Sequence, residues 1–164
     1  MSLINLQCAD LYVQIAPDIG AAITQFYRLD TETGARFDYL RPSTAQAIKE
    51  GAISEMASFL MAPWAGRIRE GRFTYQGRSI HYPSADPNQP HSMHGFTRDN
   101  PWQVVAVQLA QGLESQALAH LRYRHSADTA WPFSFTIDQT IRLSVTGLRI
   151  EVSVRNDGQV VMPF

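Results

Sequence analysis

The chain has 164 residues, close to the usual size of one domain, and a folded chain of this length buries roughly two thirds of its unfolded surface. Hydrophobic residues make up 45% of the sequence, which excludes global disorder. Fourteen Lys and Arg residues against fifteen Asp and Glu residues give a net charge of -1. The composition therefore predicts no nucleic acid partner and no anionic membrane partner.

A single cysteine, Cys8, excludes an internal disulfide and a metal site built from several thiolates. No apolar run approaches the roughly 20 residues of a membrane span. The first residues lack the basic stretch followed by an apolar stretch that marks a secretory signal. These features lead us to expect a cytoplasmic protein.

Most of the chain reads as strands separated by turns. Apolar and polar residues alternate with period two, which predicts strands that bury one face. In chain order, the expected strands cover residues 11–15, 21–29, 73–75, 78–82, 102–107, 133–137 and 148–154. Turn residues separate several of them, with a cluster at 30–34, a tight hairpin at Gln76 and Gly77, and a turn at Gly147.

One short helix is expected over residues 44–50, with Ser43 as its N-cap and Gly51 as its stop, although a loop fits this segment almost as well. The sequence contains no internal repeat, no low-complexity tract and no Pro/Gly linker. We therefore expect one domain over residues 1–164. Its predicted fold class is all-β, an antiparallel β-sandwich.

Residues 83–101 form a segment of different composition, with four prolines, two asparagines and two histidines. The sequence predicts a long irregular loop here, and loops of this length are usually functional or disordered. The embedded residues His91, His94 and Phe96, together with the adjacent Trp102, argue against disorder.

His94 is a candidate functional residue within this loop. It precedes Gly95, so its ring can meet a ligand with little steric cover, and histidine exchanges protons near neutral pH. The alternative interpretation is a hydrogen-bonded histidine that holds the loop backbone. A zinc site needs three or four ligands, and His91 and His94 have no nearby partners in the sequence, so we expect no metal.

A second unusual segment contains Trp64 and Arg67 among small residues and a proline. An arginine with apolar neighbours must find hydrogen-bond acceptors, and a polyol ligand offers them. An indole face also suits the apolar side of a sugar ring. The alternative is that Arg67 pairs with a structural carboxylate such as Glu70 or Asp99.

Several motifs together, in their order and spacing, resemble the aldose 1-epimerases, or galactose mutarotase-like proteins. The resemblance extends from about Ala16 to the last residue. It rests on Phe59-x-x-x-Pro63-x-x-x-Arg67-Ile68-x-x-Gly71-x-Phe73, Gly77, His91-Ser92-Met93-His94-Gly95-Phe96, Pro101-Trp102-x-Val104, Trp131-Pro132-Phe133, Leu148, Asn156 and Met162-Pro163-Phe164. It implies a large antiparallel β-supersandwich and a reaction that interconverts the α and β anomers of a hexose.

The resemblance also implies roles for individual residues. Arg67 would hydrogen-bond the hydroxyls of a small-molecule sugar, and His94 would take an auxiliary catalytic role beside the ring oxygen or a neighbouring hydroxyl. The reaction moves protons at two oxygens, so no cofactor is expected.

The chain departs from the family pattern in two places. Gly66 stands where relatives often have an asparagine, and the sequence ends at Phe164. Relatives carry the general acid histidine and the general base glutamate further on, so we expect the N-terminal half of a truncated sandwich. A sheet cut midway has unpaired edges. We therefore expect exposed apolar surface, or a homo-oligomer through strand 148–154 and the tail at 160–161.

Two alternative functions remain open at this stage. Arg98 follows the His-Gly motif and could meet a phosphate, which favours a sugar-phosphate epimerase, unless Arg98 is a surface residue that pairs with Asp99. The chain could also be a non-catalytic carbohydrate-binding module, or an inactive remnant.

Overall fold

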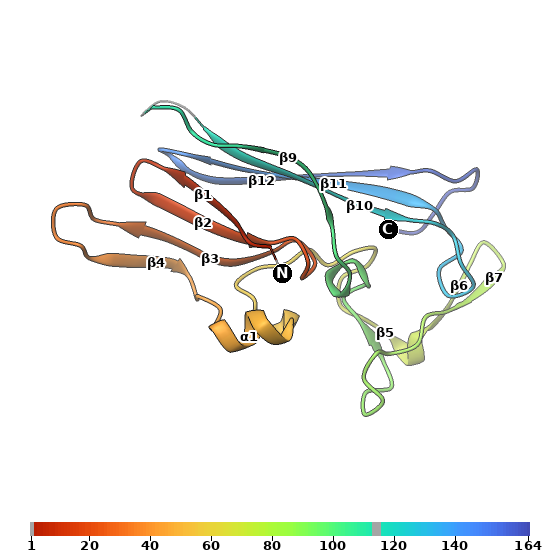
Figure 1. Cartoon of the computed structure of the whole chain (residues 1–164). Coiled ribbons are helices and arrows are strands. Elements are labelled where there is room, and N and C mark those ends of the chain that lie inside the picture. The colour runs from red at the N-terminus through yellow and green to blue at the C-terminus, as the bar shows by residue number, and fades with distance from the viewer. Residues whose placement is uncertain (1, 113–115) are drawn as a thin grey trace.

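Two four-stranded antiparallel sheets form the layers of the fold. A computed structural model of the chain describes residues 2–112 and 116–164. The first sheet has the order β1-β2-β3-β4 and the second the order β12-β11-β10-β9, so each is a simple meander (Figure 1). The bounds are Ile4–Cys8, Leu11–Ala16, Ala22–Leu29 and Arg36–Leu40 for β1 to β4, and Gln103–Gln108, Ala117–His125, Phe135–Ser144 and Gly147–Asn156 for β9 to β12. This architecture confirms the predicted all-β antiparallel sandwich.

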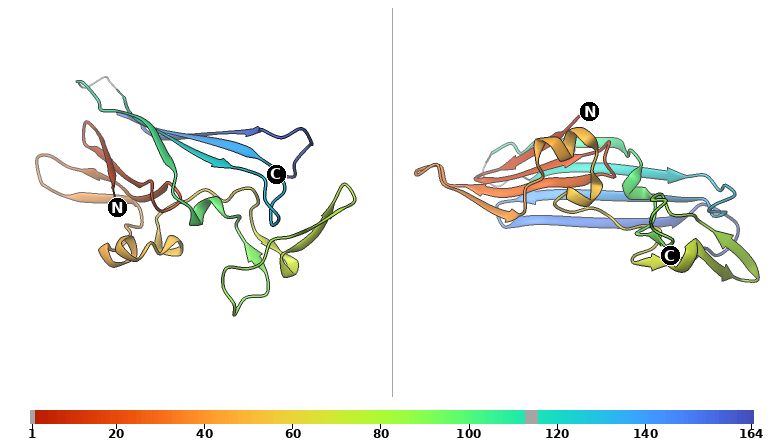
Figure 2. Two further views of the ribbon diagram at one scale, coloured as in Figure 1. Left: turned by 45° about the vertical axis from the view of Figure 1, so that its right-hand side comes forward. Right: turned by 90° about the horizontal axis from the view of Figure 1, so that it is seen from below.

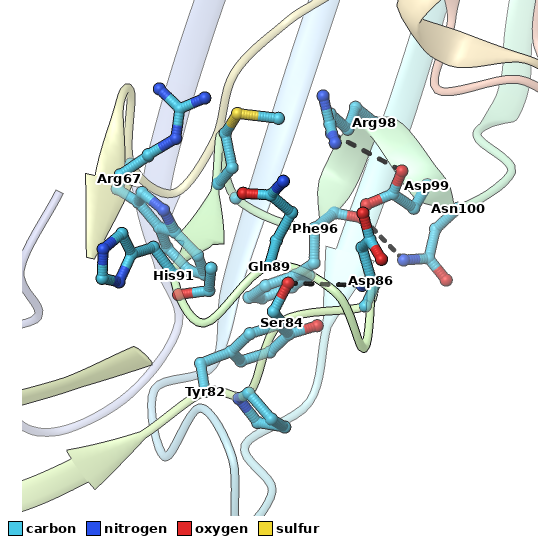
Figure 3. Close-up of a pocket in the computed structure, with 16 residues that line it drawn as sticks. Arg67, Tyr82, Ser84, Asp86, Gln89, His91, Phe96, Arg98, Asp99 and Asn100 are labelled. Atoms are coloured by element: carbon cyan, nitrogen blue, oxygen red, sulfur yellow. Dashed lines mark hydrogen bonds and ion pairs between the residues drawn. The ribbon is translucent and has the colours of Figure 1, made fainter. Parts of the chain in front are cut away.

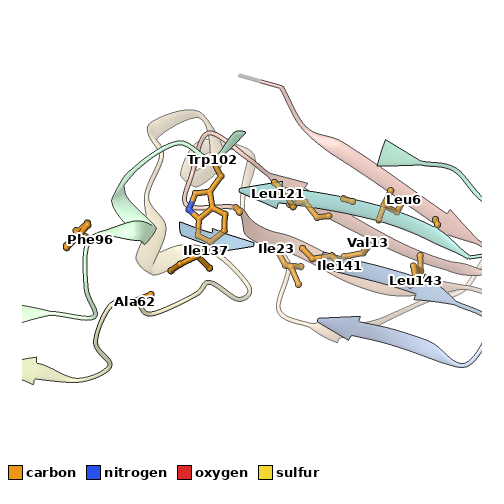
Figure 4. Packing of buried hydrophobic residues seen from close by; sticks show 14 of the residues in the cluster. Leu6, Val13, Ile23, Ala62, Phe96, Trp102, Leu121, Ile137, Ile141 and Leu143 are labelled. Carbon is orange, nitrogen blue, oxygen red and sulfur yellow. The ribbon is translucent and has the colours of Figure 1, made fainter. Parts of the chain in front are cut away.

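The core lies between the two sheets because their strands alternate as the sequence predicted. Along β11, Phe135, Ile137, Gln139, Ile141 and Leu143 are buried, while Asp138, Thr140 and Arg142 between them are only half-buried. Strand β1 contacts β10 and β11, and β2 contacts β11. Side chains from both layers therefore meet in one cluster (Figure 4).

The short helix forms, but its N-cap is Thr44 and not the predicted Ser43. Helix α1 covers Ala45–Glu50, and the Ala47 N–H donates to Thr44 Oγ1 at 3.0 Å. Ser43 is held by another bond, since its N–H donates to the Thr24 carbonyl at 2.7 Å. Gly51 ends the helix in the left-handed conformation, with φ of 67°, as predicted.

A smaller region of two-stranded ribbons lies beyond the end of the first sheet (Figure 1). Strands β6 (Arg72–Tyr75) and β7 (Arg78–His81) form the predicted hairpin, and both turn residues, Gln76 and Gly77, have positive φ. Strands β5 (Arg67–Ile68) and β8 (Ser92–Met93) form the other ribbon. The expected irregular segment 83–101 therefore contains β8. Short 3-10 turns cover Ile53–Glu55, Arg69–Gly71 and Thr97–Asp99, and the last of these also lies in that segment.

The Ala62 carbonyl joins the segment before β5 to the segment after β8. This oxygen accepts hydrogen bonds from the N–H groups of Phe96 and Thr97, at 3.0 and 3.2 Å, and from the Thr97 hydroxyl at 3.1 Å. Gly95 makes this approach possible. Its φ is +67°, and a Cβ built on it would lie 1.8 Å from the Ala62 oxygen.

Replacing Gly95 with alanine should destabilise the fold by about 3 kcal/mol, because the new methyl group adds overpacking to left-handed backbone strain. The matched control is Gly34→Ala. Gly34 also has a positive φ, but nothing lies within 4 Å of its Cβ position, so we expect a loss of about 1 kcal/mol from strain alone. Urea unfolding measures both values, and equal losses would contradict a close approach at Gly95.

Candidate functional site

The β5–β8 ribbon places Arg67 opposite Met93, one residue from His94. Gly66 and His94 extend the ribbon through two reciprocal bonds. The His94 N–H donates to the Gly66 carbonyl at 2.8 Å, and the Gly66 N–H donates to the His94 ring nitrogen Nδ1 at 3.1 Å. Gly66, His94 and Gly95 all have positive φ, so regular strand alternation ends at this point.

The bond from Gly66 determines which tautomer His94 adopts. Because Nδ1 accepts a backbone N–H, it carries no proton, and the neutral ring must carry its proton on Nε2. Burial lowers the pKa of His94 below its ordinary value, and the positive charges of Arg98 and Arg67 lower it further. Near neutral pH, His94 is therefore a neutral ring that carries its proton on Nε2.

Beside the ribbon lies a hollow of about 410 Å³ (Figure 3). It is walled by β5, β8 and the segments that follow β7 and β8. Its lining residues are Trp64, Arg67, Tyr82, Pro83, Ser84, Ala85, Asp86, Gln89, His91, Ser92, Met93, Gly95, Phe96, Arg98, Asp99 and Asn100. His94 is not among them, although both of its chain neighbours are.

Arg67 is an exposed residue of the hollow with a free guanidinium. Within residues 2–112 and 116–164, no hydrogen bond or ion pair engages its side chain. The carboxylates considered as its structural partners pair elsewhere, since Glu70 lies 3.9 Å from Arg69 and Asp99 lies 3.5 Å from Arg98. The structure therefore does not show the alternative in which Arg67 pairs with Glu70 or Asp99.

Arg98 is held more firmly than Arg67. Its side chain is only 14% exposed, its guanidinium lies 5.5 Å from the centre of the Phe59 ring, and its Nε is 3.5 Å from Asp99 Oδ1. Burial raises the pKa of Asp99, although Arg98 acts in the opposite direction. The sequence left open whether Arg98 meets a phosphate or pairs with Asp99, and the structure shows the ion pair with Asp99.

Trp64 forms part of an aromatic wall. Its ring centre lies 5.2 Å from that of Tyr82, 6.0 Å from that of Phe96 and 5.3 Å from that of Trp131. Burial raises the pKa of Tyr82 to about 12, so its hydroxyl stays protonated at neutral pH. The wall gives the hollow the apolar surface that suits a sugar ring.

The structure adds polar residues that the sequence did not assign to a site. His91 lines the hollow, and its Nδ1 accepts the Glu70 N–H at 3.1 Å, so its neutral ring also carries the proton on Nε2. Asp86 and Gln89 line it from the segment after β7. The prolines around them marked an unusual loop, but no local pattern indicated which side chains face the hollow.

The hollow combines donors and acceptors on different sides. Arg67 and His91 lie on one side, and Arg98, Asp99 and Asn100 lie on the other (Figure 3). A polyol has hydroxyls that donate and accept together, so such a mixture over an aromatic wall can hold a small sugar. In the described part of the chain, no three His, Cys, Asp or Glu side chains gather to hold a metal ion.

Comparison with known proteins places the chain in one family. The family model described as aldose 1-epimerase matches residues 2–164. Among curated proteins, YphB of Escherichia coli K12, which is uncharacterized, is 26% identical over 164 residues, or 100% of this chain and 49% of YphB. YihR from the same organism is 26% identical over 106 residues, or 64% of this chain and 32% of YihR. The chain thus spans at most about half the length of these relatives.

Solved structures agree with this placement. A crystal structure from Escherichia coli K12, provisionally named an aldose 1-epimerase, has a TM-score of 0.74 and 25% identity, and the match covers 96% of this chain and 47% of that one. A galactose mutarotase-like protein from Clostridium acetobutylicum shares the fold, with a TM-score of 0.73 and 20% identity over 94% of this chain and 45% of that one. Among the described residues, no helix is long and apolar enough to cross a membrane. The chain belongs to the aldose 1-epimerase family.

Proposed function

We propose that this chain supplies the sugar-holding part of an aldose 1-epimerase, a protein that interconverts the α and β anomers of a free hexose. The single observation that carries the proposal is the β5–β8 ribbon. It holds Arg67, whose guanidinium has no partner among the described residues, near His94, whose Nδ1 accepts the Gly66 N–H so that the neutral ring carries its proton on Nε2. Family membership over residues 2–164 supports the same conclusion.

The reaction requires proton transfer at two oxygens of the sugar. A base removes the proton of the anomeric hydroxyl while an acid protonates the ring oxygen, and the ring opens. The C1–C2 bond then rotates and the ring closes on the other face. In this scheme Arg67 binds hydroxyls, and His94 donates Nε2–H to the ring oxygen or a neighbouring hydroxyl. The resemblance assigns the general acid histidine and general base glutamate to the part of the relatives that this chain does not match.

Arg98 supports a second candidate, a sugar-phosphate substrate. Its Nε is buried and makes no hydrogen bond among the described residues, and Arg98 lines the same hollow as Arg67. Its ion pair with Asp99 weighs against this substrate, because a phosphate would have to displace the carboxylate. We therefore favour the free hexose.

Polarimetry and calorimetry test the proposed function together. We expect saturable binding of D-galactose or D-glucose by calorimetry, and polarimetry on fresh α-D-glucose then decides whether the chain alone catalyses mutarotation. Acceleration above the buffer rate would show catalysis by the chain itself. Binding without acceleration would identify it as the sugar-holding part only. Absence of both would contradict the proposal and favour an inactive remnant.

Arg67→Ala should weaken hexose binding about ten- to hundredfold, because it removes charge-assisted hydrogen bonds to the sugar. Arg69→Ala is the matched control. Arg69 follows the same short strand, but its side chain is 89% exposed and makes only a long ion pair with Glu70, at 3.9 Å. Calorimetric titration of both variants measures the difference. Equal affinities for the two variants would remove Arg67 from the site.

His94 should be found in the Nε2–H tautomer, with a pKa below the usual histidine range. Nitrogen chemical shifts of the ring during an NMR pH titration report both properties. The sign of the linked stability effect follows, because the unfolded chain takes up this proton at higher pH than the folded chain. The stabilising contribution is present above about pH 6.5 and is lost as the pH falls through the lower, folded-state pKa.

His94→Gln is the control for this pH dependence, since glutamine does not titrate. We expect the acid-side loss of stability to be smaller in this variant than in the wild type. Asp99 titrates from a raised pKa in both proteins, so its effect cancels in the comparison. A ring protonated on Nδ1 at neutral pH would contradict the hydrogen bond from Gly66.

The variant Arg98→Ala tests the alternative of a sugar-phosphate substrate. If the substrate is a free hexose, Arg98→Ala should change the affinities for glucose and glucose 6-phosphate by the same factor. Calorimetry with both sugars measures the ratio. A loss confined to glucose 6-phosphate would instead assign Arg98 to a phosphate site.

A further inference from the structure

Two histidines flank strand β8 of the ribbon, and a backbone amide engages each of them. The ribbon lies beyond the end of the first sheet in both views of Figure 2. His94 directly follows β8, and the Gly66 N–H donates to its Nδ1. His91 directly precedes β8, and the Glu70 N–H donates to its Nδ1 at the same distance, 3.1 Å. Each end of β8 therefore carries one imidazole whose Nδ1 is occupied.

The Glu70 amide reaches His91 from a tight turn that an ordinary side chain does not favour. Glu70 has φ of 53° and ψ of 20°, the left-handed region, which residues other than glycine rarely adopt. Gly71 follows with φ of +63°, and a Cβ built there would lie 2.0 Å from the Tyr82 carbonyl oxygen. The Tyr82 N–H also donates to the Gly71 carbonyl at 2.8 Å. Packing against Tyr82 thus holds the turn in a strained conformation, and strain of this kind is concentrated at binding and catalytic sites.

His91 and Arg67 share one face of the ribbon. Arg67 pairs with Met93 in the antiparallel register, so their side chains lie on the same face. His91 precedes Met93 by two residues, which places it on that face, because side chains alternate along a strand. Residues in this diagonal relation have Cα atoms about 7–8 Å apart, a distance that long side chains can bridge. All three residues line the hollow (Figure 3).

The unengaged polar groups of His91 and Arg67 are donors. In the part of the chain that the structure describes, the His91 ring makes no hydrogen bond beyond the one from Glu70, so Nε2–H of the neutral ring has no partner. The Arg67 guanidinium, as described above, has none either. Neither group can accept a hydrogen bond, whereas the oxygen of a sugar hydroxyl can. Two donors on one face therefore match two neighbouring hydroxyls of a pyranose.

His91 and His94 reach different parts of a bound sugar. They are three residues apart, which corresponds to about 10 Å along an extended strand. The reaction scheme assigns His94 to the ring oxygen or a neighbouring hydroxyl, where protons move. This separation leaves His91 a hydroxyl that takes no part in the reaction.

We propose that His91 is a further sugar-binding residue, which donates its Nε2–H to a non-reacting hydroxyl of the hexose beside the hydroxyl held by Arg67. This role rests on the proposed function, because it requires a hexose in the hollow. The Glu70 amide has a positioning role, since it fixes the tautomer that leaves the proton on Nε2. His91 also discriminates between hexoses, because an epimer without a hydroxyl at this point leaves the donor unpaired.

The variant His91→Asn separates this contact from a purely structural role. The side-chain oxygen of asparagine can accept the Glu70 N–H in place of Nδ1, but asparagine is too short to place a donor where Nε2 lies. We expect the unfolding midpoint of the wild type and an affinity for D-galactose about three- to tenfold weaker by calorimetry, because one neutral hydrogen bond is lost. His81→Asn is the matched control and should leave the affinity unchanged, because His81 ends β7, is exposed and does not line the hollow.

A series of deoxy sugars identifies the hydroxyl that His91 holds. Galactose derivatives that lack the hydroxyl at C2, C3, C4 or C6 are titrated into the wild type and into His91→Asn. The derivative without the contacted hydroxyl should bind both proteins with equal affinity, and the other derivatives should bind the wild type about three- to tenfold more tightly. A weakening of the same size for every derivative would overturn the assignment of His91 as a contact residue.

NMR of the wild-type ring gives a readout that needs no variant. At saturating D-galactose, the Nε2 signal of His91 should shift, whereas the Nδ1 signal should stay close to its sugar-free value because Glu70 still occupies that nitrogen. Unchanged His91 signals, or equal affinities of His91→Asn and the wild type for D-galactose, would overturn this role while the proposed function stands. If the wild type binds no hexose, the proposed function and the role of His91 are both contradicted.

Discussion

The Ala62 carbonyl is the contact on which the candidate site depends. It accepts bonds from two backbone amides and one hydroxyl of the segment that follows His94. Gly95 lies directly against it, where no other residue fits without strain. At the other end of the same segment, Gly20 packs against the Arg98 backbone and donates its N–H to the Asn100 carbonyl. Two glycines thus set the position of the loop that carries His94 and Arg98.

This fixed loop gives His94 its chemical character. The ring is oriented by the Gly66 amide, and burial, followed by the charges of Arg98 and Arg67, lowers its pKa and so disfavours its protonation. A neutral histidine of defined tautomer donates a hydrogen bond without moving a proton itself. That property suits a group that polarises a sugar oxygen while other groups exchange protons with it. Arg67 adds a positive charge close enough to act on His94.

Much of the fold could be predicted from the sequence, because strands and tight turns are determined by residues that lie close together in the chain. Period-two alternation indicated the sandwich, and Gln76 and Gly77 indicated a hairpin whose turn demands positive φ. Strands β1, β4 and β10 were missed, although Phe37 and Tyr39 alternate with Arg36 and Asp38 along β4. The predicted N-cap of the helix was wrong by one residue. Ser43 and Thr44 can both cap a helix, and the choice between them depends on the hydrogen bond from the Ser43 N–H to the distant Thr24 carbonyl.

The site was predictable only in part. Family motifs marked Arg67 and His94, and the neighbouring residues pointed to Trp64 and Arg98, but the partner that orients His94 lies 28 residues away in the sequence. The roles of Asp86, Gln89 and His91 as lining residues depend on how the loop after β7 returns to the ribbon. Long-range contacts of this kind leave no periodic signal in one sequence.

The most direct measurement is a crystal structure of the chain with bound D-galactose. We expect the pyranose to lie beside the β5–β8 ribbon, with hydroxyls within hydrogen-bond distance of the Arg67 guanidinium and a sugar oxygen at His94 Nε2. A sugar bound elsewhere, in contact with neither side chain, would contradict the assignment of these residues.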